Sequence, residues 1–181
     1  LSRGLGDVYK RQSHEHVSII EVMGRNAGYL ALWCGIANGA EDILLPEKYD
    51  YDEQRIINNI IDNRKKGKKH HIIINAEGIG HSQAMAKRIE AATGIETRAT
   101  ILGHMQRGGT PTCKDRVYAS IMGAKAVDIL LEGKTKRVIC YRDGEYIDMD
   151  INEALAMKKS ISEYQYEVSY SLSHNYSKNN Q

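Results

Sequence analysis

Several residue types and patterns are scarce or missing in this sequence of 181 residues. It contains no phenylalanine and only two prolines, and eleven tyrosines supply most of its aromatic surface. Glycine or charged residues interrupt every apolar run well before the roughly 18 residues that a membrane span needs. The beginning of the sequence also lacks the apolar core of a secretory signal peptide. These absences predict a cytoplasmic protein that does not associate with membranes.

The sequence also lacks a large excess of either positive or negative charge. The 25 basic residues nearly balance the 23 acidic ones, which leaves a net charge of +2. A general nucleic-acid-binding protein would be far more basic, so no nucleic-acid partner is expected. Any anionic ligand must instead be held by a local cluster of charge. The hydrophobic fraction of 41% is close to the globular average and predicts a folded core.

Cysteine is sparse as well. The three cysteines, Cys34, Cys113 and Cys140, are odd in number and have no metal-ligand spacing. We expect reduced thiols in buried structural positions. The pairs His14/His16 and His70/His71 lack further cysteine or acidic partners at ligand spacing, so the sequence does not favour a metal site at either pair.

The first twelve residues have no hydrophobic period and no initiator methionine. We interpret residues 1–12 as a non-native leader, with a native disordered arm as the alternative, and exclude them from the fold.

From there on, short β-branched runs alternate with longer helical patterns, which predicts βαβ units and an α/β fold with a mostly parallel sheet. Thr112 and Asp115 predict a capping box, and residues 142–145 a hairpin turn. We expect the polar tail, residues 171–181, to be frayed. Strands are expected over residues 17–22, 43–45, 71–75, 97–102 and 137–141, and helices over 28–38, 52–66, 82–93 and 112–131.

Unusual residues follow three of these strands, where a parallel α/β sheet binds ligands. Gly24 and Arg25 follow the first strand and suit a phosphate. Glu77, after the strand at 71–75, could accept hydrogen bonds from sugar hydroxyls, although the residue taken alone favours a solvated or helix-capping role. His104 and Arg107, beside a Gly-Gly pair, predict an anion site, to which Arg98 could contribute.

A second basic cluster covers residues 64–69 and continues into His70 and His71. Such a run is typical of a solvated helix end, and a second anion site is the alternative.

Two stretches, residues 21–31 and 97–111, closely resemble the bacterial phosphofructokinases, as do the short segments 40–41, 45–47 and 115–116. The Gly-His-x-Gln-Arg-Gly-Gly block, which contains His104 and Arg107, is highly specific to that family. The match extends from about Ser13 to the last helix.

The resemblance implies phosphoryl transfer from ATP, with Mg²⁺, to the 1-hydroxyl of fructose 6-phosphate in glycolysis. It also implies that Arg98 reaches across a subunit interface, as in a homotetramer. Glu41 is the expected ligand of an effector-site Mg²⁺. The resemblance assigns fructose 6-phosphate binding to Met23, Gly24, Arg25, Glu77, Arg98, His104 and Arg107, and binding of a nucleotide effector such as ADP to Gly39, Glu41, Lys66, Lys68 and His70.

The sequence departs from the family pattern in two respects. His16 stands where the family usually has a second cross-interface arginine, so we expect weaker or more pH-dependent binding of the sugar phosphate. The glycine-rich nucleotide loop, the magnesium-binding aspartate and the catalytic-base aspartate have no counterpart in these residues. The resemblance therefore predicts the C-terminal part of the enzyme, which binds the sugar phosphate but does not catalyse, and contains no catalytic residue of its own.

The resemblance divides the chain into three parts. Residues 13–104 correspond to the sugar and effector lobe, 105–154 to part of the nucleotide lobe, and 155–181 to a return to the sugar lobe. We expect exposed apolar surface and aggregation. A pyrophosphate-dependent enzyme and a non-catalytic sugar-phosphate-binding protein remain alternatives, whereas a dinucleotide-binding domain lacks its glycine fingerprint.

Overall fold

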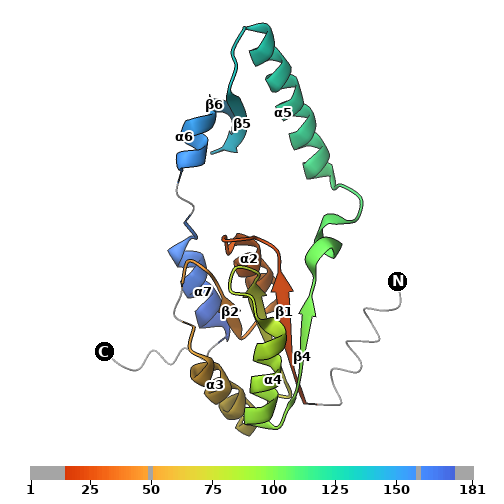
Figure 1. The fold of residues 1–181 in the computed structure, drawn as a ribbon, viewed down its shortest axis with the longest axis vertical. Helices are drawn as coiled ribbons and strands as arrows, with labels where there is room; N and C mark the ends of the chain where they lie inside the picture. The colour runs from red at the N-terminus through yellow and green to blue at the C-terminus, as the bar shows by residue number, and fades with distance from the viewer. Residues whose placement is uncertain (1–14, 49–50, 158–159, 174–181) are drawn as a thin grey trace. The chain divides into compact units, whose positions relative to one another are not determined.

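The computed structural model describes residues 15–48, 51–157 and 160–173 (Figure 1). The leader expected over residues 1–12 lies outside the described residues. The described residues form two compact units, one within residues 15–107 and 160–173 and one within residues 108–157. Their strands are β1 (His16–Val22), β2 (Asp42–Leu44), β3 (His70–Ala76), β4 (Glu96–Ile101), β5 (Arg137–Arg142) and β6 (Glu145–Asp150). Their helices are α2 (Tyr29–Asn38), α3 (Glu53–Lys65), α4 (Ser82–Thr93), the 3₁₀ helix η1 (Gly103–Arg107), α5 (Cys113–Leu131), α6 (Ile151–Ala156) and α7 (Glu163–Ser173).

The first unit is built on a four-stranded sheet in the order β2-β3-β1-β4. All of its neighbouring strands are parallel, which confirms the expected α/β class. The register places Glu21 of β1 opposite Asn75 of β3 and opposite Ile101 of β4. The carboxyl ends of these three strands therefore lie at the same edge of the sheet.

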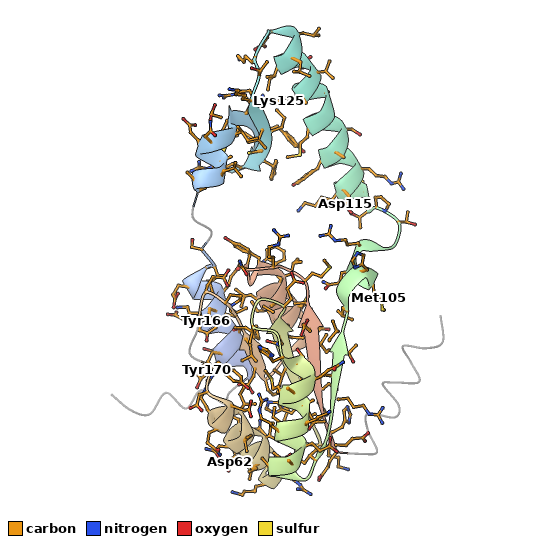
Figure 2. All side chains as sticks on the ribbon, in the orientation of Figure 1. Asp62, Met105, Asp115, Lys125, Tyr166 and Tyr170 are labelled. Carbon is orange, nitrogen blue, oxygen red and sulfur yellow. The ribbon has the colours of Figure 1, made fainter. Side chains whose placement is uncertain are left out.

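Helices cover both faces of this sheet. On one face, Ile19 and Ile73 pack with α3 and α4 through Ile56, Met85 and Ile89, all nearly inaccessible to water. On the other face, α2 contacts both β3 and α7. Figure 2 labels Tyr166 and Tyr170 on α7, and the Tyr166 ring packs against this second apolar cluster.

The helix ends follow the local sequence signals. Gly39 and Gly94 end α2 and α4 in the left-handed conformation, with φ of 61° and 68°, which glycine adopts without a steric penalty. The Asp52 carboxylate accepts two backbone N–H bonds at the start of α3. Thr112 and Asp115 form the expected capping box at the start of α5.

The second unit consists of α5, α6 and the antiparallel hairpin β5–β6. Asp143 and Gly144 both have positive φ, as a two-residue hairpin turn requires. The rings of Tyr118, Tyr141 and Tyr146 form a cluster with centroid distances of 4.6 to 5.7 Å. Three tyrosines thus supply the aromatic contact between α5 and the hairpin.

Two expectations are wrong in detail. Residues 171–173 belong to α7, in which the Ser171 hydroxyl donates to the Glu167 carbonyl oxygen at 2.9 Å, and the rest of the tail lies outside the described residues. Cys113 is exposed rather than buried, since it opens α5 on the solvent side, whereas Cys34 and Cys140 are partly buried; all three are free thiols. In the part of the chain that the structure describes, no helix is both long and apolar enough to span a bilayer.

The apolar surface of α5 generates a prediction. Of the 19 residues of this helix only Ile129 is buried, and Leu130 and Leu131 are 65% and 82% exposed. Because such apolar surface drives association, we expect concentration-dependent self-association in analytical ultracentrifugation. Replacing Val127, Leu130 and Leu131 with glutamine should lower the sedimentation coefficient at the same concentration. A parent chain that stays monomeric at all concentrations would show that this surface does not drive self-association.

Candidate functional site

The turn that follows β1 carries Met23, Gly24 and Arg25 at the carboxyl edge of the sheet. Ala27 N–H closes this turn by donating to the Gly24 carbonyl oxygen at 2.9 Å. Arg25 has a φ of 50°, a conformation that non-glycine residues rarely adopt. Its backbone N–H donates to a carboxylate oxygen of Glu77, and this long-range bond holds the unusual conformation.

Glu77 comes from the next strand of the sheet, directly after β3. Its own N–H donates to the Val22 carbonyl oxygen at 2.9 Å, which ties the two strand exits together through the backbone. Gly78 then passes close to the first turn. A Cβ at Gly78 would overlap the Arg25 carbonyl oxygen and lie 2.9 Å from Pro46 Cγ. Glycine at this position is therefore required by the close approach of the two loops.

Gln106 joins the segment after β4 to the turn after β1. Its Oε1 accepts the Met23 N–H at 2.7 Å, so η1 contacts the turn that carries Arg25. His104 and Arg107, the two predicted anion ligands, lie exposed on this same short helix. Figure 2 labels Met105 on this helix beyond the end of β4. Gln106 was not among the predicted ligands, because its contact with Met23 spans 83 residues and leaves no local signal in the sequence.

The structure thus brings Met23, Gly24, Arg25, Glu77 and η1 together, but it does not bring Arg98 to them. Arg98 lies within β4 opposite Ser18, three residues before Ile101. Three residues along a strand separate it from the carboxyl edge by about 10 Å. Its side chain is exposed and binds Glu96, with 2.7 Å between Nε and Oε1. Arg98 therefore lies on the edge strand β4, away from the cluster formed by Arg25, Glu77 and η1.

A second group of predicted residues lies at the opposite, amino end of the sheet. The buried Glu41 carboxylate binds Lys68 Nζ at 2.5 Å and accepts the Ile72 N–H at 2.5 Å. Gly39 precedes Glu41 as the C-cap of α2, Lys66 caps α3, and His70 begins β3. A shallow depression beside them is lined by His16, Arg64, Lys68 and His70. The depression also contains the apolar Val17, Ile60 and Ile95 and the acidic Glu15, which binds Arg64 at 2.9 Å, so only part of its lining suits an anion.

Glu41 was expected to bind an effector-site Mg²⁺ ion, and the contacts of its carboxylate bear on that expectation. Both carboxylate oxygens already have a partner, and the adjacent Asp42 binds the buried His71 at 2.8 Å. Among the described residues, no group of three or more His, Cys, Asp or Glu side chains could hold a metal ion. Magnesium prefers an octahedron of oxygen ligands. A Mg²⁺ ion at Glu41 would therefore need most of its oxygens from a bound ligand, and the role stays a prediction.

These features define a parallel α/β domain with a polar cluster at the carboxyl edge of its sheet and a basic cluster at the amino edge. The chain belongs to the phosphofructokinase family, whose profile, described as Phosphofructokinase, matches residues 8–130.

Relatives of known name support the same assignment. The chain is 52% identical over 161 residues to an "ATP-dependent 6-phosphofructokinase" of Clostridium botulinum (strain Loch Maree / Type A3), covering 89% of this chain and 50% of that protein. It is 56% identical over 160 residues to "ATP-dependent 6-phosphofructokinase 1" of Clostridium perfringens (strain 13 / Type A), covering 88% and 50%. The chain thus spans about half the length of the curated relatives it matches.

Solved structures share the fold. Phosphofructokinase from Saccharomyces cerevisiae matches 94% of this chain and 23% of its own with a TM-score of 0.74 and 28% identity. A pyrophosphate-dependent phosphofructokinase from Marinobacter aquaeolei matches 88% of this chain and 45% of its own with a TM-score of 0.73 and 23% identity, which indicates a common fold.

The contact between the two loops can be tested at Gly78. We expect Gly78→Ala to push the Arg25 turn away from Glu77 and to cost roughly 1–3 kcal/mol of stability, as overpacking does. Chemical denaturation and hydrogen exchange of the Arg25 amide would measure both effects. Gly123→Ala is the matched control, because a Cβ at Gly123 in α5 meets nothing within 4 Å. Equal behaviour of the two variants would contradict the close approach.

Proposed function

We propose that this chain supplies the fructose 6-phosphate-binding part of an ATP-dependent 6-phosphofructokinase. That enzyme transfers the γ-phosphoryl group of ATP to the sugar 1-hydroxyl and forms fructose 1,6-bisphosphate in glycolysis. The names of the relatives at 52% and 56% identity support ATP as the donor. The observation that carries the proposal is that the segments after β1, β3 and β4 contact one another. Glu77 accepts the Arg25 N–H, and Gln106 accepts the Met23 N–H.

Each residue of this cluster has a role that fits a sugar phosphate. One oxygen of Glu77 accepts the Arg25 N–H, and the carboxylate can also accept a hydrogen bond from a sugar hydroxyl. Such a contact rejects ligands that lack the hydroxyl, because the ligand would cover the carboxylate and leave it unpaired. Arg107 and His104 offer charge-assisted donors to the 6-phosphate, and Arg25 adds a third cationic side chain. Met23 and Gly24 shape the turn around the sugar.

Arg98 has a different place in the proposal. Its position on the edge strand β4, away from the cluster, supports a role in the site of a neighbouring subunit. We therefore propose a homo-oligomer, a tetramer as the resemblance implies, in which two copies complete each sugar-phosphate site.

The chemical step needs groups that these 181 residues do not supply. The resemblance assigns phosphoryl transfer to a glycine-rich loop and two aspartates that have no counterpart here. Mg²⁺ would neutralise charge on the phosphates of ATP when bound. We accordingly expect the chain by itself to bind the sugar phosphate without turning it over, in a cytoplasmic setting.

The basic cluster at the amino edge supports a second ligand in this proposal. Lys68, His70 and Lys66 are suited to the phosphates of a nucleotide effector such as ADP, and Gly39 leaves room beside them, since nothing lies within 4 Å of the position of its Cβ. Glu41 orients Lys68 by binding its Nζ atom. An effector-site Mg²⁺ would be shared between Glu41 and the nucleotide phosphates.

Arg107→Lys tests the sugar-phosphate site. Lysine keeps the charge but loses the planar fork of donors that matches a phosphate. We expect the dissociation constant for fructose 6-phosphate, measured by calorimetry on this chain, to rise about tenfold, since such hydrogen bonds contribute roughly 1.5–3 kcal/mol. Arg88→Lys is the control, because Arg88 binds Glu53 on the α3–α4 side of the sheet. Unchanged binding by Arg107→Lys would remove Arg107 from the site.

Lys68→Met tests the second site. Removing this charge should weaken ADP binding at least about tenfold and leave fructose 6-phosphate binding unchanged, because the two clusters lie at opposite ends of the sheet. Lys87→Met removes an exposed lysine of α4 that does not line this depression, and it is the matched control. If both variants bind ADP as the parent does, the basic cluster is a solvated surface.

A further inference from the structure

A buried polar network lies directly beneath the proposed sugar-phosphate cluster. The Ser82 hydroxyl donates to Glu21 Oε2 at 2.6 Å and accepts from Asn75 Nδ2 at 2.8 Å. Asn75 Nδ2 also donates to the Gly80 carbonyl oxygen at 2.9 Å. Asn75 and Ser82 are 0% and 1% exposed. The network therefore joins the ends of β1 and β3 to the first residue of α4, with Asn75 and Ser82 shielded from water and Glu21 partly buried.

The loop held by this network is conformationally demanding. Gly80 and His81 both have positive φ, of 67° and 56°, just before α4 begins. The left-handed conformation of His81 is costly for a residue with a side chain and persists only where its surroundings enforce it. The two hydrogen bonds of Asn75 Nδ2 reach the residues on either side of His81. Asn75 thus fixes the loop that begins with Glu77.

The same network also fixes the turn after β1. Glu21, which accepts the Ser82 hydroxyl, lies two residues before Met23. The Glu21 backbone oxygen accepts the Leu102 N–H at 3.1 Å, next to the start of η1. Glu21 therefore connects the strand that carries the Arg25 turn both to the β3–α4 loop and to the segment that carries His104.

We propose that Asn75, Ser82 and Glu21 are positioning residues that set the distance between the Glu77 carboxylate and the Arg25 turn, and thereby the geometry for the sugar phosphate. The sugar-phosphate role rests on the proposed function. The arrangement has a cost, because Asn75 Oδ1 is buried without a hydrogen-bond partner among the described residues. An apolar side chain of similar shape would avoid that cost.

Because Asn75→Leu removes the buried, unpaired Oδ1 atom, this variant can show whether the network positions the loops or only stabilises the fold. If the network only stabilised the fold, Asn75→Leu would leave the loop geometry unchanged whatever its effect on stability. If the network positions the loops, Asn75→Leu and Ser82→Ala should loosen the bond between the Arg25 N–H and Glu77 even where the chain keeps its melting temperature.

The experiment measures hydrogen exchange of single amides by NMR in the full chain. The Arg25 amide, held by Glu77, should exchange roughly tenfold faster in Asn75→Leu and in Ser82→Ala. The Gly28 amide is the internal control, because it donates to Glu47 at 2.8 Å in the same loop and should not change. Thr93→Ala is the matched variant, since it removes from α4 a hydroxyl that bonds to the helix backbone at the Ile89 carbonyl.

Calorimetry with fructose 6-phosphate completes the test. We expect about tenfold weaker binding in both network variants and parental binding in Thr93→Ala. Unchanged Arg25 exchange in the network variants overturns the positioning role without any reference to ligand. A parent chain that binds, with network variants that bind equally well, overturns the positioning role alone. A parent chain that does not bind overturns the proposed function and the sugar-phosphate role together.

Discussion

The pairing of β1 between two parallel strands is the constraint on which the rest of this structure depends. Because β3 and β4 both run parallel to β1, their carboxyl ends finish beside Val22 rather than at opposite edges. A slip of one residue would turn Ile19 out of the core and move every loop contact. Only in the observed register do Glu77 and Gln106, which are far apart in sequence, reach the backbone of the same short turn.

The two clusters differ in how they are held. At the carboxyl edge, the carboxylate of Glu77 and the amide of Gln106 orient backbone N–H groups. Within the described residues, no ion pair involves the side chains of Arg25, His104 or Arg107. At the amino edge, Lys68 is bound by the buried Glu41. An anionic ligand there must compete with Glu41 for this lysine, whereas a ligand at the carboxyl edge meets no such competition. Of the two proposed anion sites, the one at the carboxyl edge is therefore the better prepared.

Local chemistry made much of the fold predictable. Gly39, Gly94 and the Thr112 capping box end or begin helices through interactions within a few residues, and the expected helix boundaries agree with the structure to within one residue. The α/β class followed from the alternation of strand and helix patterns, and the family followed from two specific motifs.

The contacts that orient the candidate site were not predictable in the same way. Gln106 to Met23, Ser82 to Glu21 and His71 to Asp42 each join residues that are 29 to 83 positions apart. No periodicity or capping rule links such pairs, because only the sheet register brings them together. The sequence identified the residues with unusual chemistry, and tertiary packing decided which of them meet.

The position of Arg98 bears on the number of chains that a complete site requires. Its side chain is 77% exposed, and its described ionic partner is the nearby Glu96 on the same strand. Exposed ion pairs of this kind contribute little, so a phosphate could displace Glu96 at small cost. The strand β4 also forms an edge of the described sheet, where side chains can reach another molecule without disturbing the core. These three features, weak pairing, exposure and distance from the cluster, support the proposal that Arg98 serves a site on a second copy.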